Sequence, residues 1–111
     1  KYDVIPMFDN LTGFAKCPKD CSNASICIKV EDDSMSPKFD KDQYVFVELN
    51  TPLNNKDFGL FEYDNKYIIR KFIVRKTDLV LRAEKDGIDD IVISPNDNFY
   101  IIGRVLGKLE N

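Results

Sequence analysis

The sequence has no histidine, no tryptophan, two methionines, three cysteines and five glycines among its 111 residues. Without histidine, the chain cannot build a Ser-His-Asp triad, a Cys-His dyad or a zinc site with imidazole ligands. It also lacks any apolar run near the ~18 residues of a membrane helix, and no signal-peptide pattern opens it. We therefore expect a cytoplasmic protein without membrane contact.

The cysteines are too few and too poorly spaced to indicate a metal centre. Cys17 and Cys21 are four positions apart, and Cys27 lies within an apolar run. A site with three thiolates would need a fourth ligand and tighter, hairpin-like spacing. An odd count without a signal peptide is typical of a reducing compartment, in which Cys27 would be a small core residue. The sequence predicts no cofactor and no metal, and it leaves the role of Cys17 and Cys21 open.

The formal net charge is -3, but the charges are unevenly distributed along the chain. Residues 31–42 and 84–97 are rich in Asp and Glu, whereas basic residues crowd one intervening segment: Lys66, Arg70, Lys71, Arg75, Lys76 and Arg82. An acidic chain binds nucleic acid poorly unless Lys and Arg are clustered. The basic segment is therefore either a solvated ribbon that faces acidic loops or one side of a complementary self-association surface.

Short alternating apolar runs dominate the chain after residue 25. Turn residues separate them at intervals typical of an antiparallel sandwich or barrel, and none has the sustained 3.6-residue period of a helix. The Asp64-Asn65 pair predicts a tight hairpin, and Gly103 inside the last run predicts a bulge or a close backbone approach. We predict one all-β domain over residues 26–111, a partly open antiparallel barrel or sandwich with at most one short helical turn. Its strands are expected at 26–30, 44–49, 58–63, 66–74, 79–82, 90–93 and 99–106.

Residues 1–25 have little periodicity and are expected to form an arm or linker. Residues 4–8 are a short apolar anchor, which Pro6 limits to the edge of a sheet. Residues 10–25 contain Gly13, Pro18 and scattered Asn, Asp and Ser, and we interpret them as a long loop that crosses the domain surface. Because position 1 is Lys rather than Met, we expect this chain to be a piece of a longer protein.

The stretch at 31–39, between two predicted strands, holds the strongest candidate for chemistry. It reads Glu31-Asp32-Asp33-Ser34-Met35-Ser36-Pro37-Lys38-Phe39. Asp33 or Ser34 is a natural N-cap for one helical turn. A serine between the end of a strand and the start of a turn is also where nucleophiles are often placed. On the residues alone, Ser34 is either a capping residue or a nucleophile.

The order of these parts resembles the C-terminal domains of LexA, UmuD and phage lambda-type repressors, which share a fold with signal peptidases. The Gly-Asp-Ser-Met-like signature of that family is similar to Asp32-Asp33-Ser34-Met35, and its Asp-Gly-Asp turn is similar to Asp40-Lys41-Asp42. The family's hairpin matches residues 58–72, and its terminal Ile-Gly-x-Val pattern matches Ile102-Gly103-Arg104-Val105. The resemblance covers residues 26–106 and, more weakly, 5–8.

The resemblance implies a serine that attacks a peptide bond in the protein's own arm, and a lysine on the hairpin strand that takes its proton. Ser34 has the position of the nucleophile, and Arg70 has the position of the lysine. A guanidinium, with a pKa above ~12, cannot act as that base. Lys71 is adjacent, but neighbouring strand residues point to opposite faces, so Lys71 would need a register slip to reach Ser34. Residues 1–25 would be the remnant of the cleavage region, in which the usual Ala-Gly or Cys-Gly bond is replaced by Thr12-Gly13.

We therefore expect a C-terminal oligomerisation and regulatory domain of a phage or prophage-type transcriptional repressor that has lost self-cleavage. It would form a homodimer or a larger homo-oligomer, with exposed aromatics such as Phe99 and Tyr100 in a self-complementary patch. DNA would be bound by a helix-turn-helix domain outside this chain, and an antirepressor protein would be the inducing partner. The alternatives are an active self-cleaving peptidase that uses Ser34 and Lys71, a signal-peptidase-like enzyme that acts on other proteins, and an unrelated β-barrel binding module.

Overall fold

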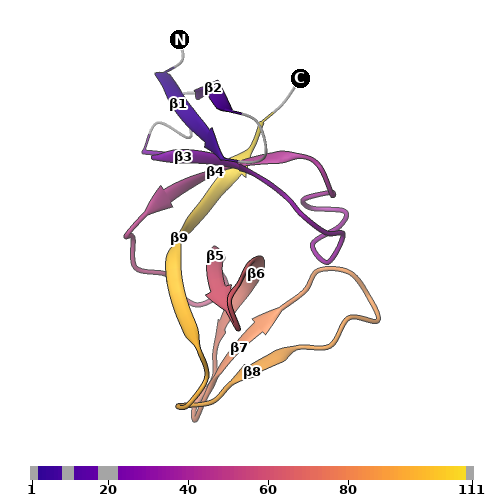
Figure 1. Cartoon of the computed structure of the whole chain (residues 1–111). Helices are drawn as coiled ribbons and strands as arrows, with labels where there is room; N and C mark the ends of the chain where they lie inside the picture. The colour runs from indigo at the N-terminus through magenta and orange to yellow at the C-terminus, as the bar shows by residue number, and fades with distance from the viewer. Residues whose placement is uncertain (1–2, 9–11, 18–22, 110–111) are drawn as a thin grey trace.

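The computed structural model describes residues 3–8, 12–17 and 23–109, whose strands form one sheet in the order β2-β1-β3-β4-β9-β5-β6-β7-β8 (Figure 1). All neighbours pair antiparallel except β1 and β3, which are parallel. None of the described residues forms a helix that could cross a membrane. The predicted all-β fold is confirmed. The strands are β1 Asp3–Phe8, β2 Thr12–Cys17, β3 Ile26–Lys29, β4 Tyr44–Leu49, β5 Phe58–Tyr63, β6 Lys66–Val74, β7 Leu79–Arg82, β8 Ile91–Ile93 and β9 Phe99–Lys108.

The long strand β9 lies between two halves of the sheet, one formed by β1–β4 and the other by β5–β8. Figure 1 shows it running through the molecule from one half to the other. Its first part pairs with β5 and its second part with β4, so that Arg104 faces Gly59 on one side and Glu48 on the other. The register against β5 shifts between Leu60 and Phe61, beside Gly103. A Cβ atom on Gly103 would lie 2.4 Å from the carbonyl oxygen of Glu48. The predicted bulge and the predicted close approach are both confirmed.

Three apolar clusters fill the interior. The largest joins the two halves and contains Met35, Val47, Leu60 and Ile69. The other two are centred on Cys27 with Phe46, and on Phe61, Phe72 and Leu81. Burying a side chain of this size stabilises the fold by roughly 1.5–3 kcal/mol. Cys27 is 0% exposed, which confirms its expected place in the core.

The two candidate patch aromatics at the start of β9 have different environments. Phe99 packs against the cluster of Phe61, with the ring centroids 5.6 Å apart, and therefore belongs to the core. Tyr100 is 59% exposed. Because successive strand residues point to opposite faces, the two rings cannot share one surface patch.

The hairpin between β5 and β6 forms at the predicted position. Asp64 and Asn65 both have positive φ, at 52° and 65°. Paired positive φ values are typical of a tight turn whose twist matches that of the flanking strands, and Asn and Asp tolerate this conformation better than other residues with side chains. This turn fixes the register that pairs Arg70 with Gly59.

The structure corrects two expectations for the N-terminal arm. Residues 12–17, predicted to be part of a long loop, form the strand β2, in which Thr12 and Phe14 are good strand formers despite the adjacent Gly13. The strand containing Pro6 is also not an edge strand, because β1 lies between β2 and β3. β1 tolerates proline there because it pairs with β3 only through Met7 and Phe8. The rest of the predicted loop up to residue 22 lies outside the described residues.

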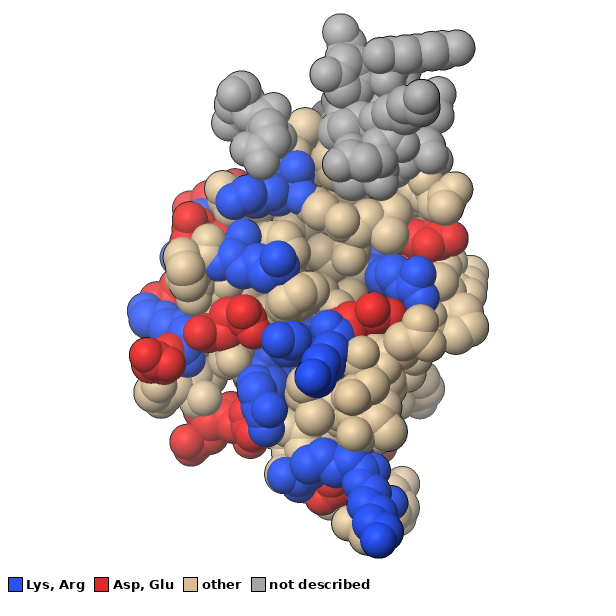
Figure 2. Space-filling model, turned by 180° about the vertical axis from the view of Figure 1, so that it is seen from behind, with Lys and Arg blue, Asp and Glu red and all other residues tan. Residues whose placement is uncertain are grey.

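Three of the six basic side chains in the basic segment have an acidic partner nearby. Arg75 binds Asp78, Arg82 binds Asp90, and Lys71 lies 4.0 Å from Glu84. Figure 2 shows that basic and acidic side chains are intermixed on the rear face of the molecule. For the exposed residues of the segment, these pairs favour the interpretation as a solvated ribbon that faces acidic partners, whereas Arg70 is buried.

Candidate functional site

Ser34 lies in the connection between β3 and β4, in a turn that two apolar side chains anchor. Met35 and Phe39 are 1% and 4% exposed and pack in the largest core cluster. The N–H of Phe39 donates to the carbonyl of Met35 at 2.9 Å, which closes a single helical turn. The side-chain hydrogen bond at the start of this turn does not come from either expected N-cap residue, Asp33 or Ser34. Instead, the Oδ1 atom of Asp32 accepts a hydrogen bond of 3.0 Å from the N–H of Ser34.

The connection between β7 and β8 is hydrogen-bonded to the same turn. The N–H groups of Glu84 and Lys85 both donate to the carbonyl oxygen of Ser34, each at 3.0 Å. The ammonium of Lys85 also pairs with the carboxylate of Asp33, and this hydrogen bond lowers the pKa of Asp33 below its ordinary value of 3.8. The main chain at Ser34 is therefore fixed on both its N–H and its carbonyl side.

Arg70 on β6 is a buried cation beside this turn. Its side chain is 8% exposed, and Nε and Nη1 have no hydrogen-bond partner among the described residues. Burial lowers the pKa of the Arg70 guanidinium, while the carboxylates of Asp32 and Asp90 act in the opposite direction. A guanidinium starts from a pKa far above neutrality, so Arg70 stays protonated and cannot accept a proton from a hydroxyl.

Lys71 has a different environment from Arg70. Its side chain is 30% exposed, its Nζ lies 4.0 Å from the Glu84 carboxylate and 5.6 Å from the centre of the Phe58 ring. The cross-strand pairing of Lys71 with Phe58 and of Arg70 with Gly59 shows no slip at this point of the hairpin. Within the described part of the chain, no hydrogen bond connects the Ser34 hydroxyl with either basic side chain.

Two features of this arrangement bear on acyl transfer at Ser34. A nucleophilic hydroxyl needs a base that is neutral part of the time, and the buried neighbour is a guanidinium. The developing oxyanion is commonly stabilised by main-chain N–H groups, including that of the nucleophile itself. Here the N–H of Ser34 is bonded to the anionic side chain of Asp32, whose charge would repel an oxyanion at that place.

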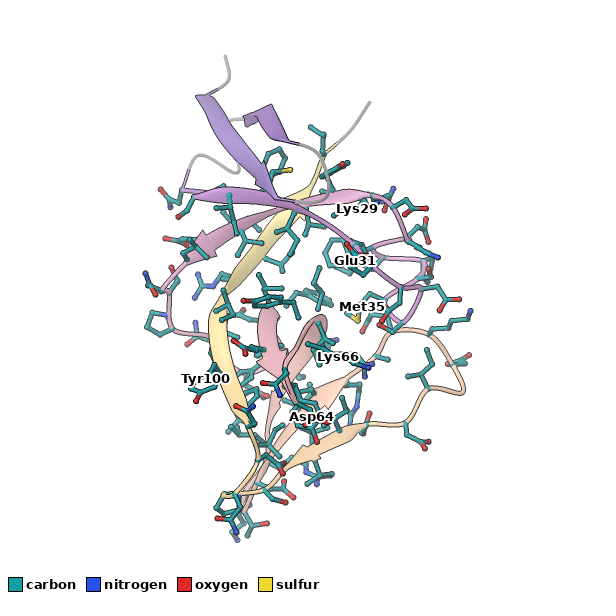
Figure 3. All side chains as sticks on the ribbon, in the orientation of Figure 1. Lys29, Glu31, Met35, Asp64, Lys66 and Tyr100 are labelled. Carbon is teal, nitrogen blue, oxygen red and sulfur yellow. The ribbon has the colours of Figure 1, made fainter. Side chains whose placement is uncertain are left out.

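A groove of about 450 Å³ lies next to the turn, between β3 and the β5–β6 hairpin. Its walls are mainly aliphatic, and charged side chains of residues 29–32 form part of the rim. Figure 3 shows Lys29, Glu31 and Met35 on the β3–β4 side and Lys66 on the β6 side. The sequence does not predict this groove, because alternating apolar residues predict a buried face and do not distinguish core positions from groove walls. The aliphatic residues that line it include Ile26, Ile28, Leu49, Leu60, Ile69 and Ile102.

The arm bond expected at the cleavage position lies in the edge strand β2. Thr12 and Gly13 pair with Phe8 and Met7 of β1. In Figure 1 the β1–β2 hairpin is separated from the β3–β4 connection that carries Ser34. The structure therefore does not bring the predicted bond and the predicted nucleophile together.

The structure adds little on the cysteines and metals. Cys21 lies outside the described residues, and Cys17 ends β2. Among the residues that the structure describes, no three His, Cys, Asp or Glu side chains are grouped so that they could hold a metal ion.

Comparison with known proteins supports the expected family. No curated protein matches the chain. The family model described as Peptidase S24-like matches residues 5–106, which is most of the chain and includes the Ser34 turn and the whole β5–β6 hairpin. The chain therefore belongs to the Peptidase S24-like family, the group of LexA, UmuD and the signal-peptidase-like proteins.

Proposed function

We propose that this chain is the C-terminal oligomerisation and regulatory domain of a phage or prophage-type transcriptional repressor that no longer cleaves itself. The observation that carries the proposal is the buried, permanently charged Arg70 on the hairpin strand, where catalysis by Ser34 would need a titratable amine. The bond between Asp32 and the N–H of Ser34 supports it independently.

In this role the domain acts through association. A helix-turn-helix domain outside this chain binds DNA, and two copies must be held together for their recognition helices to reach paired half-sites. Linking two weak contacts raises the effective affinity through local concentration. Fusing this chain to a monomeric helix-turn-helix domain should therefore increase affinity for DNA with two half-sites, but not for DNA with one. Equal affinities for both DNAs would contradict the oligomerisation role.

The loss of cleavage is tested by intact-mass measurement. The chain is incubated for days at neutral and at alkaline pH, alongside Ser34→Ala and Lys71→Ala. We expect all three proteins to keep their full mass. An active peptidase with Lys71 as its base would instead lose residues 1–12 at alkaline pH, and both substitutions would prevent this. That result would overturn the proposal.

A repressor that does not cut itself needs another inducing event. We propose an antirepressor protein that binds this domain, because the aliphatic groove beside the Ser34 turn offers a concave surface for an apolar segment. An induced lysogen extract that yields no specific partner on the immobilised chain would remove the basis for this part of the proposal.

A further inference from the structure

A second hollow, of about 400 Å³, lies between the end of the Ser34 turn, the start of β5 and the end of β9. Its floor contains Phe39 and Phe58, whose rings meet edge to face, and Leu106. Lys38 and Lys108 line it, and no acidic side chain does. The ammonium of Lys38 lies 4.8 Å from the centre of the Phe58 ring. The hollow is therefore lined by apolar and by positively charged side chains.

The cations of this hollow have no ion-pair partner among the residues that the structure describes. Neither Lys38 nor Lys108 forms an ion pair with any described residue, whereas three of the six basic side chains of the β6–β7 segment do. The face of the Phe58 ring attracts cations, so the Lys38 ammonium is held above it. A ligand for the hollow should accordingly carry carboxylates beside an apolar group.

The connection between β7 and β8 carries that combination. Figure 1 shows this connection projecting from the sheet. The charged residues at the two ends of this connection form ion pairs within the molecule. Glu84 pairs with Lys71, Lys85 with Asp33, and Asp90 with Arg82. The tip that remains reads Asp86-Gly87-Ile88-Asp89.

At the tip, Asp86 and Asp89 are exposed and form no ion pair with any residue that the structure describes. Gly87 has φ of 86°, a left-handed conformation that turns the chain at this point, and its neighbourhood is open space. Two carboxylates thus flank Ile88 on a projecting loop. The tip and the hollow are complementary in charge, and the tip also carries one half-buried apolar side chain, Ile88.

We infer that the β7–β8 tip of one copy occupies the Lys38–Lys108 hollow of a second copy. The two features are neighbours in one molecule, because Lys71 lies against both Phe58 in the hollow and Glu84 at the base of the connection. Neighbouring donor and acceptor surfaces allow a two-fold arrangement in which each contact is made twice, which closes a dimer. This inference rests on the proposed oligomerisation role and names the surface that performs it.

Charge reversal tests the interface by sedimentation of the whole chain. We expect the wild-type chain to dimerise, with a dissociation constant that rises about tenfold or more from low to high salt because exposed ion pairs are screened. Lys38→Glu with Lys108→Glu should give a monomer, and so should Asp86→Lys with Asp89→Lys. An equimolar mixture of the two variants should recover the dimer, because each hollow then meets a tip of opposite charge. Lys66→Glu with Lys76→Glu, the same charge change elsewhere, should stay dimeric.

The outcomes separate this inference from the proposed function. If both charge-reversed variants remain dimers, or if their mixture stays monomeric, the tip and the hollow are not the interface. Dimerisation through another surface would then still satisfy the proposed role. A wild-type chain that is monomeric at high concentration overturns the interface and the self-association together. The loss of cleavage, read by intact mass, is unaffected by any of these results.

Discussion

The backbone N–H of Ser34 donates a 3.0 Å hydrogen bond to the carboxylate of Asp32 two residues earlier. A peptidase serine needs its surrounding N–H groups for the oxyanion, and removing one such donor typically costs ~10²–10³ in rate. A carboxylate at that place is less favourable than a missing donor, because it repels the negative charge that develops on the oxyanion in the transition state. This bond fixes the main chain at Ser34 and agrees with the proposed loss of cleavage.

Supplying a titratable amine near Ser34 and freeing its backbone N–H should together make the Ser34 hydroxyl reactive. We expect the wild-type chain and Arg70→Lys alone to be unlabelled by a fluorophosphonate probe at alkaline pH, because the N–H of Ser34 stays bonded to Asp32. Asp32→Gly combined with Arg70→Lys frees that donor and supplies a titratable amine. This double variant should become labelled, as read by mass.

The control for this prediction is the same double variant with Ser34→Ala, which should not react. A small probe avoids dependence on the arm, so the result depends on the site alone. Labelling of the wild-type chain at Ser34 would show that Asp32 and Arg70 do not disable the hydroxyl.

Replacing Arg70 with methionine should stabilise the domain. The guanidinium leaves Nε and Nη1 buried without partners, and each such group costs about 1–3 kcal/mol of desolvation. Methionine has a similar length and no polar atom to satisfy. We expect the free energy of unfolding, measured with urea, to rise by about 1 kcal/mol or more.

Lys71→Met is the matched control for Arg70→Met. Lys71 is partly exposed, and its contact with Glu84 at 4.0 Å is long, so the change should stay within about 0.5 kcal/mol. A large loss of stability in Arg70→Met would mean that the guanidinium has partners that the hydrogen-bond geometry does not reveal.

Gly103→Ala should destabilise the junction between the two halves. Its new Cβ would lie 2.4 Å from the Glu48 carbonyl oxygen and 2.9 Å from a Val47 methyl group. Since the first neighbour is backbone of the paired strand, β9 must move, at a cost of about 1–3 kcal/mol or more. Thermal unfolding should show the loss as a lower Tm.

Gly87→Ala provides the comparison for Gly103→Ala. No atom lies within 4 Å of the Cβ position, and only the positive φ is unfavourable. We therefore expect a cost of about 1 kcal/mol. Equal losses at the two glycines would contradict the crowding argument for Gly103.

Acidification should remove stability that three ion-paired carboxylates contribute. Hydrogen bonds from Lys85, Arg75 and Arg82 lower the pKa values of Asp33, Asp78 and Asp90 below their ordinary 3.8. Because the unfolded chain binds these protons more tightly, the contribution is fully present above that value and is lost as the pH falls through the lowered values. Tm measured between pH 6 and pH 2.5 should fall.

The specific control for the pH dependence is Asp33→Asn, which should flatten the fall of Tm at low pH. Added salt should weaken the same dependence, because these pairs are exposed. A Tm profile unchanged by Asp33→Asn would show that the pair of Asp33 with Lys85 does not contribute to the acid sensitivity.

The strands and the hairpin were readable from the sequence because their signals are local. Alternation marked β4, β6 and β7, and Asp64-Asn65 fixed the turn that sets the register of Arg70. β2 was missed because its pattern is weak, and its pairing with β1 decides its conformation.

The details of the site were less predictable, since several groups compete for each bond. Asp32, Asp33 and Ser34 could each have capped the turn, and the pattern does not choose among them. The hydrogen bonds from Glu84 and Lys85 to the Ser34 carbonyl join segments about fifty residues apart along the chain, and no local sequence pattern predicts them. The groove and the hollow are likewise products of packing between distant strands.

The shared strand β9 has a consequence for how the domain comes apart. One continuous strand links the two halves, because β9 pairs with β5 through residues 99–104 and with β4 through residues 103–108, and the largest apolar cluster contains residues of both halves. Amide hydrogens on β4 and on β5 should therefore exchange with solvent at matching slow rates, as parts of a single cooperative unit.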